Sequence, residues 1–365
     1  MKFTPLPHFP NSERIKGHIK QNAFFYRFLV SIKGVILGSL GILRNQKGAK
    51  EHLFSTASFF VKSCSISGMP TNITIEPTNI CNLRCPVCET GAGVLNRGKR
   101  SMTLEEFKVI ADKISPFANT LMFYFMGEPF LNNDIYEMIK YAKNKEIPFV
   151  TTCTNGSFVD PEKLVESGID EVSFQICGLT KDIHKIYRTG SDLNLVMNNL
   201  KKTICARNAS KSKMRIVCGF ILMKQNEHEV DDFKKYMQQI GVDEAIVIDP
   251  CVRSLDQGRN FLPSDTNHWL YDPAAFERGE LKPKITLKNG CPWIYYSVAI
   301  LANGDVVPCC RDANGYLVMG NILSQDMKEI WNGKHFQEFR KKVIFNRSEV
   351  DICNLCSSFG IARLR

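Results

Sequence analysis

Residues 80–88 read ICNLRCPVC and bring Cys81, Cys85 and Cys88 within eight positions, directly after a short apolar run at 72–75. Three thiolates on one short loop can hold one face of a cubane iron–sulfur cluster. They ligate three of its four irons, so the fourth keeps open coordination positions, whereas a structural metal site is normally closed. A structural zinc loop or a set of reactive thiols is the alternative. We favour a 4Fe-4S cluster with one open iron.

Short apolar runs alternate with helical segments from residue 71 onward. Such alternation predicts a parallel sheet with helices outside it, whose functional residues gather at the carboxyl ends of the strands. The expected strands are 72–75, 120–126, 149–154, 171–176, 214–222 and 244–249. With 365 residues, the chain is long enough for one large barrel-like domain and a smaller module.

The C-x3-C-x2-C loop behind the first strand resembles that of the radical S-adenosylmethionine superfamily. The resemblance implies an α/β fold, a partial (β/α)6 TIM-like barrel, in which Cys81, Cys85 and Cys88 ligate the cluster. It also implies that the fourth iron binds the amino and carboxylate groups of S-adenosylmethionine. Reduction by a flavodoxin or ferredoxin-type electron donor would then yield a 5'-deoxyadenosyl radical.

Further motifs of that family stand at later strand ends. The sequence MGEP at 126–129 resembles the family's G-G-E-P motif, which binds the methionine amino group, so Gly127 and Glu128 are candidates, whereas Met126 departs from the pattern. Asn155 lies in a T-N-G turn that is common in the superfamily. Arg188 matches the arginine of the family's Y-R pair, whose guanidinium meets the S-adenosylmethionine carboxylate. These four residues are expected to bind the cofactor.

The sequence QICG at 175–178 stands where family members often have S-x-D-G. In this register Gln175 keeps the hydrogen-bonding ability of the serine, whereas Cys177 loses the charge of the aspartate. Ile221, in the fifth strand, is either a neighbour of the adenine or a core residue. The Cys177 thiol could donate a hydrogen atom to a product radical, and plain packing of a small apolar residue is the alternative.

A second cysteine set follows residue 290, after a proline-rich stretch. Its order is cysteine, strand-turn-strand, cysteine, helix and C-x2-C, which resembles the SPASM module in its reduced "twitch" form, with a spacing like that of 2-deoxy-scyllo-inosamine dehydrogenase. The expected ligands of a second, auxiliary 4Fe-4S cluster are Cys291, Cys309, Cys353 and Cys356, with Cys310 as the alternative to Cys309. A zinc site is the other interpretation. A cluster closed by four thiolates offers no iron to substrate and would serve electron transfer.

The first 70 residues are strongly basic, with ten Lys or Arg against Glu13 and Glu51, in a chain of net charge +10. Apolar residues follow one another there at helical spacing: Phe25, Phe28, Leu29, Ile32, Ile36, Leu40 and Leu43. This stripe predicts either a helix on an anionic membrane surface or a helix packed on the barrel. No run of about 18 uninterrupted apolar residues is present, and an ordinary secretory signal is not recognisable. We therefore expect a cytoplasmic protein, peripheral to the inner membrane face if the helix binds lipid.

These observations divide the chain into a basic helical extension at 1–70, a core barrel like that of radical S-adenosylmethionine enzymes at 71–285 and a SPASM-like iron–sulfur module at 286–365. The leading hypothesis is an oxidoreductase that removes hydrogen from a sugar-, cyclitol- or lipid-linked small molecule. A radical epimerase that uses Cys177 and a maturase of a ribosomally made peptide are the alternatives. Arg311 and Asp312, beside the second cysteine set, are expected either to contact substrate or relay a proton, or to be simply solvated. No nucleic-acid partner is expected.

Overall fold

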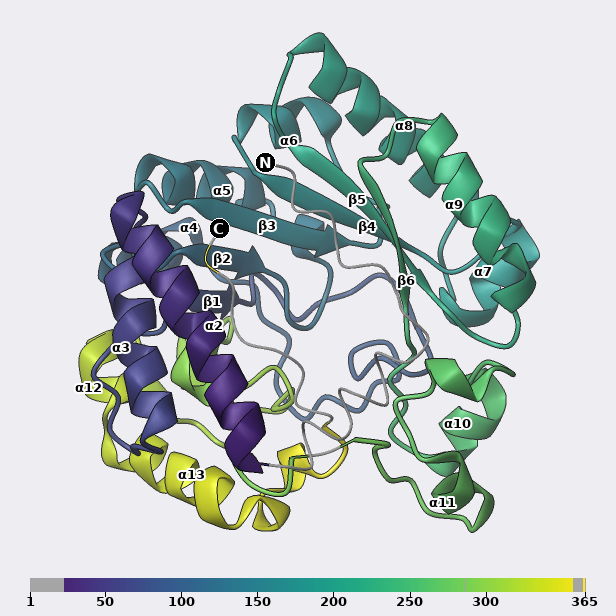
Figure 1. Ribbon diagram of the computed structural model, residues 1–365. Helices are drawn as coiled ribbons and strands as arrows, with labels where there is room; N and C mark the ends of the chain where they lie inside the picture. The colour runs from purple at the N-terminus through teal and green to yellow at the C-terminus, as the bar shows by residue number, and fades with distance from the viewer. Residues whose placement is uncertain (1–22, 286, 357–363, 365) are drawn as a thin grey trace.

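The computed structural model describes residues 23–285, 287–356 and 364. A nine-stranded sheet runs through the molecule in the order β6-β5-β4-β3-β2-β1-β7-β8-β9 (Figure 1). Its first six strands pair in parallel, each with its neighbour in the sequence. They are β1 (Asn72–Ile75), β2 (Thr120–Phe123), β3 (Phe149–Thr154), β4 (Glu171–Ile176), β5 (Arg215–Ile221) and β6 (Glu244–Ile248). The predicted partial (β/α)6 barrel is confirmed.

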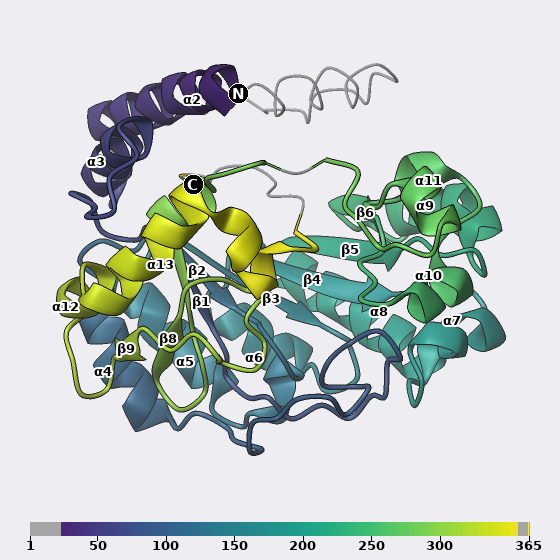
Figure 2. The same ribbon diagram turned by 90° about the horizontal axis from the view of Figure 1, so that it is seen from below.

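Helices connect these strands, and α4, α5, α6 and α8 lie along one side of the sheet (Figure 2). The connecting helices are α4 (Leu104–Ile114), α5 (Ile135–Asn144), α6 (Pro161–Glu166), α7 (Lys181–Tyr187), α8 (Leu193–Ala209) and α9 (Val230–Gln239). Their starts are set by local chemistry: Thr103 and Glu106 form a reciprocal capping box at α4, and the Asp160 side chain caps α6. Short helices α10 (Leu255–Phe261) and α11 (Pro273–Glu277) follow β6.

The C-terminal module shares the sheet of the barrel. Strand β7 (Ser297–Ile300) pairs in parallel with β1, and β8 (Asp305–Val307) turns back on it, followed by β9 (Gly320–Asn321), α12 (Met327–Trp331) and α13 (Lys334–Phe345). The predicted strand-turn-strand is therefore present, with a 3-10 turn at residues 293–295 just before its first strand. Because β7 completes the hydrogen bonds of β1 on its free side, the module continues the barrel sheet.

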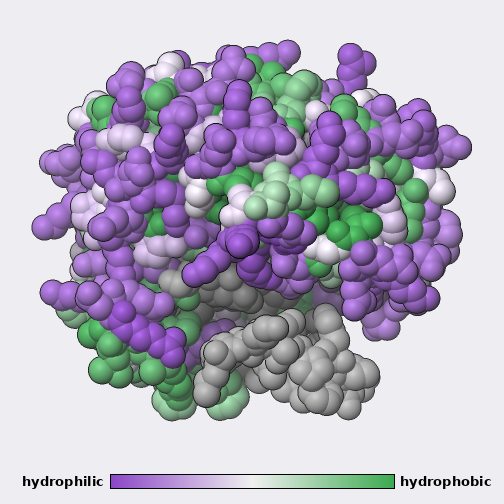
Figure 3. All heavy atoms as spheres, turned by 90° about the horizontal axis from the view of Figure 1, so that it is seen from above, coloured by the Kyte–Doolittle hydropathy of each residue, from purple (hydrophilic) through white to green (hydrophobic). Residues whose placement is uncertain are grey.

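Two helices precede the sheet: α2 (Ala23–Leu43) and α3 (Ala49–Phe60), which pack against each other. The stretch Phe24–Leu43 has a mean hydropathy of 1.5 and is, by length and composition alone, long and apolar enough to cross a membrane. The sequence-based test for uninterrupted apolar runs missed it because Arg27, Ser31 and Lys33 interrupt the run. Hydrophobic side chains gather on the edge of the molecule where α2 and α3 lie (Figure 3).

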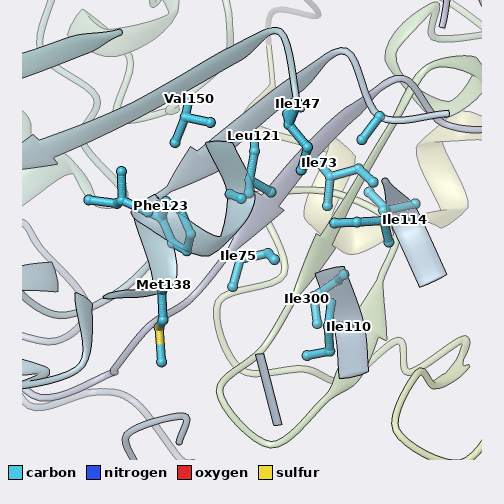
Figure 4. Packing of buried hydrophobic residues seen from close by; sticks show 14 of the residues in the cluster. Ile73, Ile75, Ile110, Ile114, Leu121, Phe123, Met138, Ile147, Val150 and Ile300 are labelled. Atoms are coloured by element: carbon cyan, nitrogen blue, oxygen red, sulfur yellow. The ribbon is translucent and has the colours of Figure 1, made fainter. Parts of the chain in front are cut away.

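The main core fills the space between the sheet and its helices (Figure 4). Ile73 of β1, Leu121 of β2 and Val150 of β3 are fully buried against Ile110 of α4 and Met138 of α5. Each such side chain contributes about 1.5–3 kcal/mol when it leaves water. This packing fixes the carboxyl ends of β1 to β6, where the predicted site residues lie.

Candidate active site

The cysteine loop directly follows β1 and is tied to the loop after α7. The Arg84 amide donates to the carbonyl of Thr189 at 2.9 Å, and the Leu83 amide donates to Cys81 Sγ at 3.4 Å. Burial raises the pKa of Cys85 to about 11, and the nearby Arg188 guanidinium works against that rise. A buried thiol keeps its proton unless a cation such as iron replaces it. The loop therefore offers the donor set that a cluster needs.

The MGEP segment lies against this loop. Gly127 has φ 81°, and a Cβ there would stand 2.4 Å from the carbonyl oxygen of Thr78, so only glycine fits without strain. The Glu128 amide donates to the carbonyl of Ile80 at 2.9 Å. These contacts hold the end of β2 beside the cysteine loop. They also explain why β2 ends at Phe123, before the predicted end at 126: the chain must leave the sheet to reach the turn.

The Glu128 carboxylate is buried and mainly accepts hydrogen bonds from the protein itself. It accepts from Thr154 Oγ1 at 2.6 Å, from the Asn155 amide at 2.7 Å and from the Phe130 amide at 3.3 Å. Burial raises the pKa of this carboxyl, and the three donors oppose the rise. Three of about four acceptor positions are used. Glu128 thus joins the ends of β2 and β3, with little capacity left for the predicted ammonium group.

The T-N-G turn contacts the cysteine loop directly. Asn155 Nδ2 donates to Asn82 Oδ1 at 2.8 Å and lies 4.0 Å from Cys81 Sγ. The Asn155 side chain also accepts from the Ser157 amide at 3.0 Å, which stabilises the turn. Asn155 is therefore at the site, where it orients the loop that carries Cys81.

Arg188 is the charged group at the centre of the site. Its Nη1 lies 3.9 Å from Cys85 Sγ, while its buried Nε has no hydrogen-bond partner among the described residues. Burial by itself lowers the pKa of Arg188, but the Cys177 and Cys85 thiols raise it above its ordinary value. A buried guanidinium with an unused donor is costly unless an anion completes it. The arrangement fits the carboxylate that the sequence predicts.

The remaining predicted residues line β4 and β5. Gln175 Nε2 donates to Ser173 Oγ at 2.8 Å, and the Gln175 side chain packs against Gly219, where a Cβ would come within 2.5 Å of it. Ile221 is partly buried in an apolar cluster that includes Leu83. The cluster also contains Cys177, which is fully buried beside Arg188. All the predicted residues of the first site thus lie at the same end of the sheet.

Arg253, which follows β6, also braces the cysteine loop and was missed at the sequence level. Its Nη1 donates to the carbonyl of Val87 at 2.8 Å, and its guanidinium forms an ion pair with Glu89. Gln257 donates to the carbonyl of Pro86 at 3.4 Å. These contacts span more than 160 residues of sequence, so no local motif could reveal them.

The second cysteine set also comes together. Cys291 lies within electrostatic reach of Cys353, Cys356 and the buried Arg347, and burial raises its pKa to about 12. Cys309 and Cys310 interact through their side chains; Cys309 also lies within electrostatic reach of Cys291, whereas Cys310 lies within reach of the Arg311 guanidinium and of Glu89 in the first loop. This placement favours Cys309 over Cys310 as the fourth ligand.

Arg347 and Arg311 supply positive charge around the second set. Arg347 donates to the carbonyls of Leu287 and Cys356, at 3.2 and 3.0 Å. Arg311 Nη1 donates to Cys251 Sγ at 3.1 Å. Cationic donors stabilise the negative charge of a thiolate-ligated cluster. Asp312, in contrast, is buried and accepts from the amides of residues 316 and 317, so its contacts are those of a turn.

Within the described residues, no three side chains of His, Cys, Asp or Glu converge as they do around a single metal ion. Ligands of a cubane surround a group of four irons and need no such convergence. The three thiols of the loop, the unused Arg188 donor and the close packing of Gly127 against the segment that leads into the loop together fit an S-adenosylmethionine cluster.

Comparisons with known proteins agree with this geometry. Residues 75–237 match the Radical SAM superfamily, and residues 291–357 match the SPASM iron-sulfur cluster-binding domain. A probable GTP 3',8-cyclase of Methanocaldococcus jannaschii is 28% identical over 172 residues, which are 47% of this chain and 56% of the cyclase. A Pyrococcus furiosus protein that modifies the cofactor of a tungsten-containing aldehyde ferredoxin oxidoreductase is 24% identical over 306 residues, 73% of this chain and 82% of that protein. The chain thus spans little more than half of the cyclase.

Solved structures share the fold. BtrN in complex with AdoMet and 2-DOIA has a TM-score of 0.51 and 17% identity, over 81% of this chain and 96% of BtrN. Streptococcus suis SuiB bound to S-adenosylmethionine has a TM-score of 0.58 and 16% identity, over 88% of this chain and 81% of SuiB. The chain therefore belongs to the radical S-adenosylmethionine superfamily and carries a C-terminal SPASM module, so it is an enzyme that uses S-adenosylmethionine, a 4Fe-4S cluster and auxiliary iron–sulfur chemistry.

Proposed function

We propose that this enzyme is an oxidoreductase that removes hydrogen from a carbon of a small molecule, such as an alcohol carbon of a sugar, a cyclitol or a lipid-linked sugar. The observation that carries the proposal is the second thiol set. Cys291 lies within electrostatic reach of Cys309, Cys353 and Cys356, and four thiolates would close a cubane completely, which would suit it to accept an electron and not to bind substrate.

In the first site, we assign Cys81, Cys85 and Cys88 as ligands of the cluster. When bound, the cluster and S-adenosylmethionine supply a 5'-deoxyadenosyl radical that removes a hydrogen atom from substrate. Arg188 would hold the carboxylate of the bound cofactor with its unused Nε donor. Asn155 fixes the loop through Asn82. Gly127 would offer backbone contacts to the methionine amino group. Glu128 would hold this turn in place through its hydrogen bonds to Thr154 and Asn155.

The chain must also keep water away from a reactive carbon. An apolar cluster of Leu83, Val87, Tyr187 and Met223 packs around the cysteine loop and is almost fully buried. Its role would be to exclude solvent from the first site. Gln175 and Ile221, from neighbouring strands, would flank the nucleoside. The reductant would be a flavodoxin or ferredoxin-type protein.

The second electron from substrate would leave through the closed thiol site. Cys310 lies within electrostatic reach of both Cys309 and Glu89 of the first loop, and Arg311 beside it donates to Cys251 Sγ. Arg311 is therefore the candidate for orienting an oxygen-bearing substrate between the two sites. We assign the auxiliary ligands as Cys291, Cys309, Cys353 and Cys356.

Product analysis tests this proposal. The reconstituted full chain is incubated with S-adenosylmethionine, dithionite and a panel of cyclitols and sugars, free and lipid-linked. A dehydrogenase yields a product lighter by two hydrogens, and a Cys353→Ala/Cys356→Ala variant still forms 5'-deoxyadenosine but no oxidised product. A Cys205→Ala variant, changed at an exposed cysteine on α8, should behave as the wild type. Oxidised product from the double variant at the wild-type rate would refute the electron-acceptor role.

A radical epimerase is the second candidate because Cys177 is buried beside Arg188, close to where the radical would form. An epimer has unchanged mass and gains deuterium from heavy water. If Cys177 is the donor, a Cys177→Ala enzyme forms 5'-deoxyadenosine without epimer. An enzyme that epimerises without Cys177 excludes that role. Peptide maturation ranks lower: between residues 23 and 71 the structure has two helices, turns and coil, without the strands of a winged-helix peptide-recognition domain.

A further inference from the structure

Helix α2 has its small residues inside and its large apolar residues outside. Gly34, Gly38 and Gly41 face α3 so closely that added Cβ atoms would come within 2.5–3.0 Å of Thr56, Leu53 and Ala49. All seven residues of the predicted apolar stripe are instead exposed, by 37–82%. A helix that packs on a protein core has the opposite arrangement, with its large apolar side chains buried. Small residues at a helix contact and large apolar residues outside are typical of helices in lipid.

The apolar surface is extended by α3 and surrounded by positive charge. Phe54, Phe60 and Val61 are exposed by 39–69% and lie on α3 or directly after it. Between residues 23 and 62 the chain has six Lys or Arg and one acid, Glu51, whose carboxylate accepts from the Met69 amide at 2.8 Å. An exposed apolar face of this size with basic residues around it is complementary to an anionic lipid surface.

We propose that α2 lies in the surface plane of an anionic phospholipid bilayer, with its apolar face below the headgroups and the rest of the enzyme in water. This membrane-binding face, defined by the exposed residues of α2 and Phe54, Phe60 and Val61, is independent of the reaction that the enzyme catalyses.

The contacts of α3 favour this surface position over a spanning helix. Phe59 packs edge-on against Tyr295 with ring centroids 5.2 Å apart, and Thr56 Oγ1 lies 2.9 Å from the Tyr296 hydroxyl. Since the glycine face of α2 contacts α3, and α3 is anchored to the C-terminal module, crossing the bilayer would break both contacts. Tyr26, near the start of α2, is also buried within reach of Cys291.

A second copy of the chain is a poorer occupant of this face. Lys33 is exposed in the middle of α2, and Arg44 follows the end of the helix. In a two-fold contact each copy would bring the same basic residues to the interface, where like charges repel. Lipid phosphates, in contrast, pair with these cations.

Vesicle flotation of the reconstituted full chain tests the proposal, with phosphatidylcholine vesicles that contain or lack phosphatidylglycerol. We expect binding to the anionic vesicles that falls at high salt. Phe28→Gln/Ile32→Gln/Ile36→Gln should reduce binding at least tenfold, because three exposed apolar side chains are lost. Lys33→Glu/Arg44→Glu/Lys50→Glu should reduce it more than 100-fold, since each basic residue contributes about fivefold. Iron content reports that both variants remain folded.

The matched control is Phe158→Gln/Ile186→Gln/Phe345→Gln, which replaces three equally exposed apolar residues elsewhere and should bind as the wild type. Equal flotation of the control and the α2 variants, or no flotation of the wild type, overturns the proposal. So does a wild-type dimer in light scattering that the Phe28 triple variant abolishes, because a second copy would then cover the face. Resistance of the membrane-bound chain to alkaline carbonate would indicate a spanning helix instead.

Discussion

Replacing Arg188 should weaken the binding of S-adenosylmethionine far more than it disturbs the fold. The buried Nε of Arg188 has no hydrogen-bond partner among the described residues, and Nη1 lies 3.9 Å from Cys85 Sγ. A hydrogen bond to a charged group contributes about 1.5–3 kcal/mol, so losing a two-pronged contact should raise the dissociation constant about 100- to 1,000-fold. We choose Arg188→Met, because methionine is an apolar residue of similar length and suits this buried position. Arg188→Lys keeps the charge but loses the planar guanidinium, so its dissociation constant should lie between those of the wild type and Arg188→Met.

The assay is equilibrium dialysis of labelled S-adenosylmethionine against the anaerobically reconstituted full chain. Iron content is measured in parallel, because a variant without its cluster would lose binding for another reason. Arg84→Met is the matched control: Arg84 is an exposed arginine of the cysteine loop and should bind as the wild type. An Arg188→Met enzyme with full iron and an unchanged dissociation constant would refute the reasoning.

Three further predictions concern stability. Gly127→Ala should lower the free energy of unfolding by about 1–3 kcal/mol in urea titrations, because of the positive φ and the close carbonyl, whereas Gly98→Ala, which meets no atom within 4 Å, should be neutral. Arg97→Ala should lower the free energy of unfolding by about 3–5 kcal/mol, because it removes the guanidinium whose two Nη atoms lie 2.8 and 2.6 Å from the fully buried Glu76 carboxylate. An equal loss in a variant that also carries Glu76→Gln would contradict this explanation. Burial lowers the pKa of His52 to about 4, so the unfolded chain takes up a proton at a higher pH than the folded chain does. The free energy of unfolding should therefore fall by on the order of 3 kcal/mol as the pH falls from about 6.5 to 4. His52→Phe should flatten that dependence in denaturation at varied pH, and an unchanged slope would exclude His52 as its source.

The sequence predicted the barrel well because alternating apolar runs and local motifs carry most of its information. Five of the six strands have the predicted bounds to within one residue, and β2 ends early because the MGEP turn begins there. The cysteine loop and Arg188 could be recognised because residues close in the chain define them. The pairing of β7 with β1 and the brace from Arg253 could not, since they join segments more than 160 residues apart.

The N-terminal helix shows a different limit of sequence reasoning. Its apolar stripe was recognised, but a periodic pattern says only that one face is apolar, and not which face the protein covers. By sequence alone, glycines at 34, 38 and 41 indicate only a weakened helix. In the structure they let α3 approach, which leaves the apolar face outside. Only the position of the neighbouring helix could decide this.

Iron and sulfide counting after anaerobic reconstitution tests the central assignment most directly, because it separates the two cysteine sites. The wild type should contain about eight irons, as two cubanes require. Cys81→Ala/Cys85→Ala/Cys88→Ala should contain about four and form no 5'-deoxyadenosine with dithionite and S-adenosylmethionine. Four irons in the wild type, all lost in the triple variant, would contradict the auxiliary cluster and with it the proposed path for the second electron.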